Sequence, residues 1–424
     1  MEIKVNPIIN NNMLIIGAGE AGGRIAQEFS NHGFSKVIAL NTAKADLEGL
    51  ELGEERKFLV QVSDGQGAGK NPEKVRQAID SFYADALGFV QKWIDGATSC
   101  YVLVGGGGGT GGGLGLVLAQ IAGELGLPVG VIYTLPRQSE GGLVFYNALK
   151  NLREMHENAK SMAISPLIIV DNNKLTDKFE SSAANFWGPV NSAIVEVMKS
   201  FNEFSQRPSK HFSALDGEDL KRLLSKGGAC AIGSFDISET DSEEALTRRI
   251  ADSFFMDGFN LATAGAAGVI VLGSQKTLET SSSSRFLKIV LDQTAELIKG
   301  GDMFVGVYDQ EDVKFLRAYV IFNGLKLPDE RIKAMMEGVR SSYDKMKAKE
   351  NRIGDGIFLD TEGDVEDMFS DTGGHGGTIR RIIRPNSSGG QSQGGFGSSD
   401  RPAIQMNQPK AAPAKVDGVK RKER

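Results

Sequence analysis

Two glycine-rich segments near the start of the chain have the composition and spacing to surround a phosphate group. Residues 105–113 hold eight glycines around a single Thr110, and Gly17, Gly19 and Gly22 form a G-x-G-x-x-G pattern. A turn without Cβ atoms lets several backbone N–H groups converge on one anion, and a following helix adds its N-terminus. A flexible linker is the alternative for residues 105–113, but apolar runs of strand and helix type flank them directly. We therefore expect a phosphate-binding loop.

Other nucleotide-binding classes fit these segments less well. Neither segment has the lysine of a P-loop, which disfavours a P-loop NTPase. The G-x-G-x-x-G pattern also describes a Rossmann-type NAD-dependent oxidoreductase, which needs an acidic residue after the second strand to hold the ribose. The chain has Leu40, Asn41 and Thr42 there. This alternative also leaves the eight-glycine cluster unexplained.

The elements that must hold these loops alternate between strand and helix over residues 1–175. The strand candidates are residues 13–16, 36–40, 100–104, 128–134 and 167–170, and the helix candidates are residues 24–29 and 114–125. This rhythm predicts an α/β fold with a Rossmann-like parallel sheet covered by helices on both faces.

A long helix and a second α/β unit are predicted to follow. Residues 189–206 begin with a proline suited to a first turn, and their apolar residues share one helical face: Val190, Ile194, Val197, Met198 and Phe201. Strand candidates in the second unit are residues 269–272, 304–308 and 317–322. Residues 327–349 have the pattern of an amphipathic helix.

A family resemblance becomes specific at residues 107–113. Gly107, Gly108, Gly109, Thr110, Gly111, Gly112 and Gly113 resemble the GGGTG signature of the tubulin/FtsZ superfamily, with Gly112 where Ser or Thr is usual. The resemblance covers about residues 13–325 and implies a GTPase that binds GTP or GDP, with Mg²⁺ held mainly through the phosphates. It also implies five parts: a GTP-binding domain (1–188), a central core helix (189–206), an activation domain (207–325), a C-terminal helix (326–350) and a disordered tail (351–424).

The remaining nucleotide loops arrive in the family's order: the second (residues 41–42), the third (67–72), the fifth (134–137 with 140–141) and the sixth (171–175). The third loop looks most like that of the TubZ branch. Ala43 stands where FtsZ commonly has Asp. The resemblance places Asn172 against the purine, and Asn191 on the central helix as the guanine reader, a role that a carboxamide suits. A solvated helix residue is the alternative for Asn191. The other implied nucleotide contacts are Gly17, Gly19, Glu20, Ala21, Gly22, Asn41, Gly67, Ala68, Gly69, Lys70, Asn71, Pro136 and Glu140.

The candidate catalytic segment is residues 214–220, where Asp216 and Asp219 resemble the FtsZ acids and Ala214 replaces an asparagine. Carboxylates can orient an attacking water. Helix capping by Asp216 is the alternative, and the two roles are compatible. In the family this segment completes the next subunit's site, which implies hydrolysis activated by polymerisation and a head-to-tail filament.

Composition adds a tail and a cellular setting. The net charge is −6, yet residues 371–424 carry ten Lys/Arg against four Asp/Glu. We expect a flexible tail that is acidic, then basic, and that only solubilises the chain, contacts DNA weakly, or binds a TubR-like DNA-binding adaptor. Cys100 and Cys230 are expected to be reduced core residues. No metal-ligand spacing, signal peptide or membrane span is apparent, which predicts a cytoplasmic protein.

Three tasks follow from these features. A filament that moves plasmid or phage DNA is the main hypothesis. An FtsZ-like division filament or a phage spindle that centres DNA keeps the fold and changes the task. The Rossmann oxidoreductase is the more remote alternative.

Overall fold

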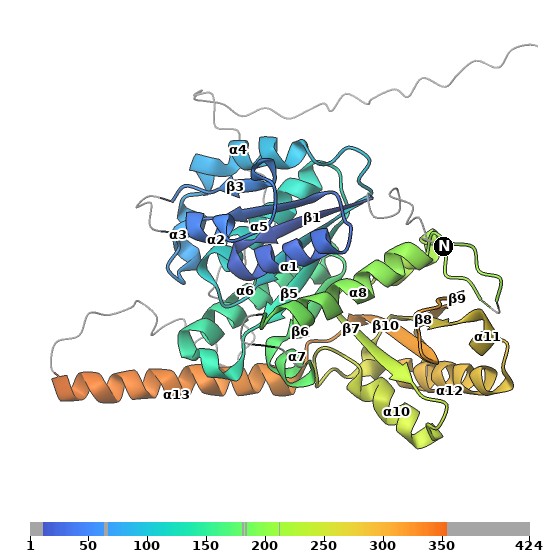
Figure 1. The fold of residues 1–424 in the computed structure, drawn as a ribbon. Helices are drawn as coiled ribbons and strands as arrows, with labels where there is room; N and C mark the ends of the chain where they lie inside the picture. The colour runs from blue at the N-terminus through green and yellow to red at the C-terminus, as the bar shows by residue number, and fades with distance from the viewer. Residues whose placement is uncertain (1–11, 63–66, 180–181, 183–184, 212, 354–424) are drawn as a thin grey trace, which may run out of the picture. The chain divides into compact units, whose positions relative to one another are not determined.

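The structure is a computed structural model that describes residues 12–62, 67–179, 182, 185–211 and 213–353. It contains one ten-stranded sheet with the order β3-β2-β1-β4-β5-β6-β7-β10-β8-β9 (Figure 1). The strands are β1 (Met13–Ala18), β2 (Val37–Asn41), β3 (Lys57–Leu59), β4 (Ser99–Gly105), β5 (Val129–Leu135), β6 (Leu167–Asp171), β7 (Ala229–Ile237), β8 (Ala266–Gly273), β9 (Asp302–Asp309) and β10 (Leu316–Leu325). Of the predicted tail (351–424), residues 351–353 belong to the last helix, and residues 354–424 lie outside the described residues.

All neighbouring strands pair in parallel except β10, which lies antiparallel between β7 and β8. The first six strands in the sheet order form the predicted parallel sheet. This sheet joins the second half through β6 and β7, where only Leu167 with Ala229 and Ile168 with Cys230 are in register. The domain boundaries stay a prediction.

Helices cover both faces of the sheet, as the βαβ rhythm predicts. The longer helices are α1 (Gly19–Asn31), α4 (Ile79–Gln91), α5 (Gly109–Glu124), α6 (Gly142–Lys160), α8 (Gly188–Phe204), α9 (Gly217–Leu224), α10 (Glu243–Asp252), α12 (Ser281–Ile298) and α13 (Asp329–Ile353). Short helices are α2 (Lys44–Glu48), α3 (Pro72–Gln77), α7 (Asn172–Lys178) and α11 (Gln275–Leu278). One core lies beneath α1, α8 and α9, and the other lies beneath α3 to α6, α10, α12 and α13.

The central helix α8 connects the two halves of the sheet. The predicted apolar face is buried in the same core as strand residues from both halves, such as Ile15 of β1 and Ile270 of β8. Figure 1 shows α8 between α1 and the strands β7 to β10. Burial of each large aliphatic side chain stabilises the fold by about 1.5–3 kcal/mol, so this helix fixes the first half against the second.

Helix α5 begins inside the glycine cluster, five residues earlier than its apolar periodicity predicts. Only Gly106, Gly107 and Gly108 form the turn between β4 and α5. The first turns of α5 pack so closely that a Cβ on Gly113 would lie 2.5 Å from Val75. Glycine is therefore required here by close packing as well as by the turn.

The two cysteines behave as the sequence predicts. Cys100 and Cys230 are free and buried in β4 and β7, and burial raises the pKa of both thiols. Within the described residues, no helix is long and apolar enough to cross a membrane.

Candidate functional site

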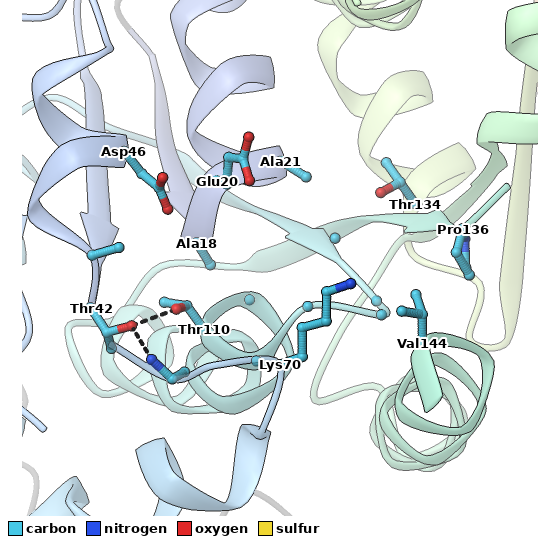
Figure 2. A pocket seen from close by; sticks show the side chains of 18 of the residues that line it. Ala18, Glu20, Ala21, Thr42, Asp46, Lys70, Thr110, Thr134, Pro136 and Val144 are labelled. Atoms are coloured by element: carbon cyan, nitrogen blue, oxygen red, sulfur yellow. Dashed lines mark hydrogen bonds between the residues drawn. The ribbon is translucent and has the colours of Figure 1, made fainter. Parts of the chain in front are cut away.

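A cavity of about 320 Å³ lies where the carboxyl ends of β2, β1, β4, β5 and β6 meet. This edge of an open parallel sheet is the usual place for a ligand. Fourteen of the predicted contacts line the cavity: Glu20, Ala21, Gly67, Ala68, Gly69, Lys70, Gly107, Gly108, Gly109, Thr110, Gly111, Pro136, Glu140 and Asn172. In Figure 2, Glu20, Lys70, Pro136 and Thr110 are among the labelled residues that surround it.

Eight further residues, which are not among the predicted nucleotide contacts, also line the cavity: Ala18, Thr42, Ala43, Asp46, Gly105, Gly106, Thr134 and Val144. Thr42 is the most informative of them. Its hydroxyl lies 2.6 Å from the hydroxyl of Thr110 and accepts a hydrogen bond of 3.1 Å from the Ala68 backbone N–H, as Figure 2 shows. One side chain thus joins three of the predicted nucleotide loops.

Three helices begin at the cavity with their first backbone N–H groups available to a ligand. The N-cap residues of α1, α2 and α5 are Ala18, Ala43 and Gly108, and none of these described residues provides a side-chain cap. Helices α9, α10 and α12 are capped by Asp216, Ser242 and Thr280, whereas α4, α6 and α8 also begin without a side-chain cap. Uncapped helix N-termini carry partial positive charge and bind anions. The cavity is therefore built for negatively charged groups.

The glycine loop is closed against the third loop too tightly to admit a side chain. A Cβ on Gly109 would lie 2.7 Å from the backbone nitrogen of Asn71 and 2.9 Å from the Cβ of Ala68. Backbone atoms in turns, with Gly67 and Gly69 at φ of +78° and +55°, complete this wall. Lys70, at a φ of +60°, holds a conformation rare for a residue with a side chain.

Six of the other predicted contacts do not line the cavity and pack within the structure that surrounds it. A Cβ on Gly17 or Gly22 would meet backbone atoms at 2.6 and 2.1 Å, and Gly19 lies against the backbone of Gly111. The remaining three take part in packing or hydrogen bonding: Asn41 donates to Asp46, Asn71 caps α3, and Gly112 packs against Asn151. Their position indicates support of the loops, and their direct contact with a ligand stays a prediction.

Asn191 lines a neighbouring depression instead of the main cavity. This depression shares Glu20 and Asp46 with the cavity and also includes Phe186 and Trp187. Arg137 lies 5.1 Å from the ring centre of Phe186 and 5.6 Å from that of Trp187. The two hollows therefore adjoin through Glu20 and Asp46, with aromatic rings and a carboxamide in the second.

A buried polar layer on α6 supports the phosphate-facing loops. Asn147 donates hydrogen bonds of 2.8 and 3.3 Å to the carbonyls of Lys70 and Gly107, and so joins the third loop to the glycine loop. Asn151 donates to the Gly106 carbonyl at 2.9 Å and accepts from Arg76 at 2.7 Å. These hydrogen bonds hold the backbone carbonyls of the two glycine-rich loops in place.

The Arg76 guanidinium completes this layer from α3. It forms a buried ion pair with Glu154 at 2.9 Å. Because α3 follows the third loop directly, the pair connects that loop to α6. Removing one partner of such a pair leaves an uncompensated buried charge, which typically costs about 3–5 kcal/mol.

The loops after β5 and β6 are held from behind by α13. Arg331 donates from Nε to Asp171 at 2.7 Å and from Nη2 to the Pro136 carbonyl at 2.7 Å. Asp171 also caps α7 by accepting from the backbone of Asn173 at 2.9 Å. Burial raises the pKa of Asp171, and the hydrogen bonds from Arg331 oppose that rise.

The predicted catalytic acids lie on the second half of the sheet, at the start of α9. Asp216 accepts a hydrogen bond of 2.8 Å from the Asp219 backbone N–H, and Asp219 accepts one of 3.4 Å from the Asp216 N–H. This reciprocal capping box confirms the capping interpretation of Asp216. Asp216 is exposed and Asp219 is half-buried, and Tyr308 holds the preceding Leu215 through hydrogen bonds of 2.9 and 3.0 Å.

Neither acid lines the cavity of its own chain, as the described residues place them. The described residues contain no group of three or more His, Cys, Asp or Glu side chains that could hold a metal ion. The oxygen atoms of Thr42, Thr110 and Asp46 at the cavity suit Mg²⁺, which is usually bound by substrate phosphates and one or two protein oxygens.

The comparisons with known proteins agree with this geometry. Residues 12–180, which carry nearly all of the cavity, match the Tubulin/FtsZ family, GTPase domain. The chain thus contains a GTPase domain of the tubulin/FtsZ family, and the predicted family and fold are confirmed.

Related proteins extend the similarity beyond this domain. The chain is 27% identical over 384 residues to Tubulin-like protein CetZ2 of Haloferax volcanii, covering 84% of this chain and 99% of the relative. It is 25% identical over 328 residues to Cell division protein FtsZ 1 of Thermococcus kodakarensis, covering 76% and 82%.

Solved structures share the fold. A GTPγS-form protofilament of Bacillus thuringiensis serovar israelensis TubZ has a TM-score of 0.70 at 20% identity, covering 82% of this chain and 96% of that chain. The GTPγS-bound protofilament of Haloferax volcanii CetZ2 has a TM-score of 0.62 at 26% identity, covering 79% and 99%.

Proposed function

We propose that the cavity binds GTP and GDP, with the phosphates against the glycine loop and the guanine toward Asn191. The observation that carries this proposal is the convergence of three uncapped helix N-termini on a glycine-walled cavity. The adjoining depression with Asn191, Phe186 and Trp187 supports the placement of the base, because aromatic rings and a carboxamide suit a purine. Mg²⁺ would be held by the phosphates with help from Thr42, Thr110 and Asp46.

Hydrolysis takes place between two copies of the chain. The cavity provides backbone N–H groups that stabilise phosphate charge, and Asp216 and Asp219 of a neighbouring copy orient the attacking water. Such a contact joins unlike surfaces, so repeating it produces a head-to-tail filament. The matched protofilaments of other family members support this arrangement.

Phosphate release at increasing protein concentration tests this function. We expect turnover per molecule to rise steeply above a threshold concentration, at which filaments appear by light scattering and electron microscopy. Turnover that stays the same per molecule at the lowest concentrations, without filaments, contradicts an interfacial active site.

Mixing two defective variants gives a sharper test. Gly109→Ala removes the phosphate-binding surface and keeps the acids, whereas Asp216→Asn keeps the cavity and removes one acid. Their mixture should hydrolyse GTP faster than either variant alone, because one interface in the mixed filament combines an intact cavity with intact acids. No gain on mixing argues against acids supplied by the neighbour.

As the finer assignment, we propose that the filament acts in the cytoplasm to move plasmid or phage DNA through a TubR-like adaptor. The TubZ-like third loop and the basic sequence of residues 371–424 support this assignment. A division filament or another tubulin-like scaffold is the second candidate, favoured by the FtsZ and CetZ relatives. A small DNA-binding gene beside repeated DNA next to this gene, with co-sedimentation of its product and filaments, supports segregation. Co-sedimentation that persists after removal of residues 371–424 argues against the tail as the docking segment.

A further inference from the structure

The C-terminal helix α13 reaches the nucleotide cavity through one side chain. Arg331 lies in its first turn, and its guanidinium donates to both oxygens of the Asp171 carboxylate, at 2.7 and 3.2 Å, and to the Pro136 carbonyl at 2.7 Å. The side chains of Arg331 and Asp171 are only 15% and 8% exposed. A bidentate pair of this kind fixes orientation as well as distance.

The two groups that Arg331 holds belong to adjacent loops of the cavity. Pro136 follows β5 and lines the cavity itself, while Asp171 ends β6 and precedes the lining residue Asn172. Leu135 and Asp171 are in register across β5 and β6, so the guanidinium spans the gap where the two strands separate. Without it, a buried carboxylate and a carbonyl would lose their shared donor.

A second contact between α13 and the cavity runs through α6. The two helices pack without room for side chains: a Cβ on Gly338 would lie 2.6 Å from Phe145, and one on Gly142 would lie 2.4 Å from Ser342. Further along α6, Asn147 bonds the carbonyls of the third loop and the glycine loop. Helix α13 thus supports the cavity on both the purine side and the phosphate side.

We propose that Arg331 is a positioning residue that couples the seating of α13 to occupancy of the nucleotide cavity. This inference rests on the proposed binding of guanine nucleotide. A ligand that orders the loops at Pro136 and Asn172 stabilises the Arg331 contacts, and therefore holds α13 in place. By thermodynamic linkage, a partner or neighbouring subunit that displaces α13 weakens nucleotide binding by the same factor.

Fluorescent GDP titrations test the binding side of this coupling. Arg331→Gln should weaken binding by about 5- to 150-fold, the usual range of coupling between two sites. Arg331→Lys should restore only part of the affinity, because a single ammonium group lacks the planar fork that meets both acceptors. Lys333→Gln, an exposed change on the same helix, is the matched control and should bind as the wild type does.

Hydrogen exchange provides a readout that a purely structural role would not move. Nucleotide should slow amide exchange over residues 332–340 in the wild type and in Lys333→Gln, and should have little effect there in Arg331→Gln. The wild-type measurement alone suffices if Arg331→Gln fails to fold, since absence of protection overturns the coupling. A wild type that binds no guanine nucleotide overturns both proposals. Equal binding by wild type and Arg331→Gln overturns only this one.

Discussion

The start of α5 at Gly109 and the start of α9 at Gly217 are both helix N-termini close to predicted chemistry, yet they are built differently. At α5 the N-cap is Gly108, and the first N–H groups face the cavity without a side-chain cap. At α9 the carboxylates of Asp216 and Asp219 cap each other's backbone. The start of α5 is a surface of backbone N–H groups that suits an anion, whereas the start of α9 is a pair of carboxylates, each bonded to the backbone of the other residue. In the proposed interfacial site the two are complementary: the cavity of one copy would hold the phosphates, and the acids of the neighbouring copy would orient the attacking water.

The largest expected effect comes from filling the space at Gly109. In Gly109→Ala the new methyl group would push the third loop away from the glycine loop, because Asn71 N lies 2.7 Å from its position. We expect nucleotide affinity to fall by about 100-fold or more, as misplaced groups in rigid sites do. Fluorescent GDP titration measures this. The control is Gly123→Ala in the same helix, where the methyl group has open space and binding should be unchanged.

The acids at α9 are tested by separating charge from capping. Asp216→Asn retains a side-chain cap and removes the negative charge, so turnover should fall by about 100- to 10,000-fold, the range for a lost acid–base or electrostatic contribution. GTP binding and assembly should persist, and filaments should become static under the microscope. Asp216→Ala should show the same loss of turnover and also lose about 1 kcal/mol of stability with the cap.

The neighbouring exposed Glu218 offers a matched control, since Glu218→Gln changes charge without removing either capping acid. Normal turnover in Asp216→Asn would leave capping as the function of this residue and remove it from the catalytic assignment.

Gly112 stands where the family usually has Ser or Thr, and we expect the effect of restoring a serine there to depend on Asn151. A Cβ on Gly112 would lie 2.1 Å from Asn151 Nδ2, so Gly112→Ser alone should destabilise the fold by about 1–3 kcal/mol, as overpacking does. Asn151→Ala alone should also destabilise, because Arg76 and the Gly106 carbonyl lose a partner. The double variant should lose less unfolding free energy than the two single variants lose together, because Asn151→Ala removes the clash with the new serine. Urea unfolding measures all three, with Gly88→Ser as a control in open space; strict additivity would contradict the coupling.

The smallest expected effect is a pH dependence at Lys178, which does not line the cavity. Burial, with repulsion from Lys174, lowers the pKa of Lys178 to about 8. The unfolded chain, with an ordinary lysine pKa, then binds more protons than the folded chain between pH 8 and about 10.5, so the lysine's contribution to stability improves as pH rises through that window. The stability of the wild type relative to Lys178→Met should therefore increase from pH 8 to 10. Lys333→Met, which alters an exposed lysine, should show no such trend.

The sequence predicts much of the fold and most of the cavity because strand ends and glycine turns leave strong local signals. The apolar runs at Cys100 and Leu167 lie in β4 and β6, and fourteen predicted contacts line the cavity. The start of α5 is predicted too late, since a run of glycines has no helical periodicity of its own. Packing against Val75, Asn71 and Asn151 requires glycine there, and that packing exists only in three dimensions.

The buried polar residues of α6 that support the loops could not be predicted from the sequence, for a related reason. Asn147, Asn151 and Glu154 are buried, although residues of these types usually face water. Their partners lie on α3 and on the loops, far away in the chain, so the spacing within α6 says nothing of them. Arg331 is a similar case, because its acceptors are 160 and 195 positions away.

The join between β6 and β7 has a mechanical consequence. The sheet is wide, yet at this point only two residue pairs are in register, against six where β1 meets β4. Bending of one half of the sheet against the other would disturb the fewest backbone hydrogen bonds at this join. The two halves of the sheet are thus joined by few strand pairs, and α8 packs across the join against both halves.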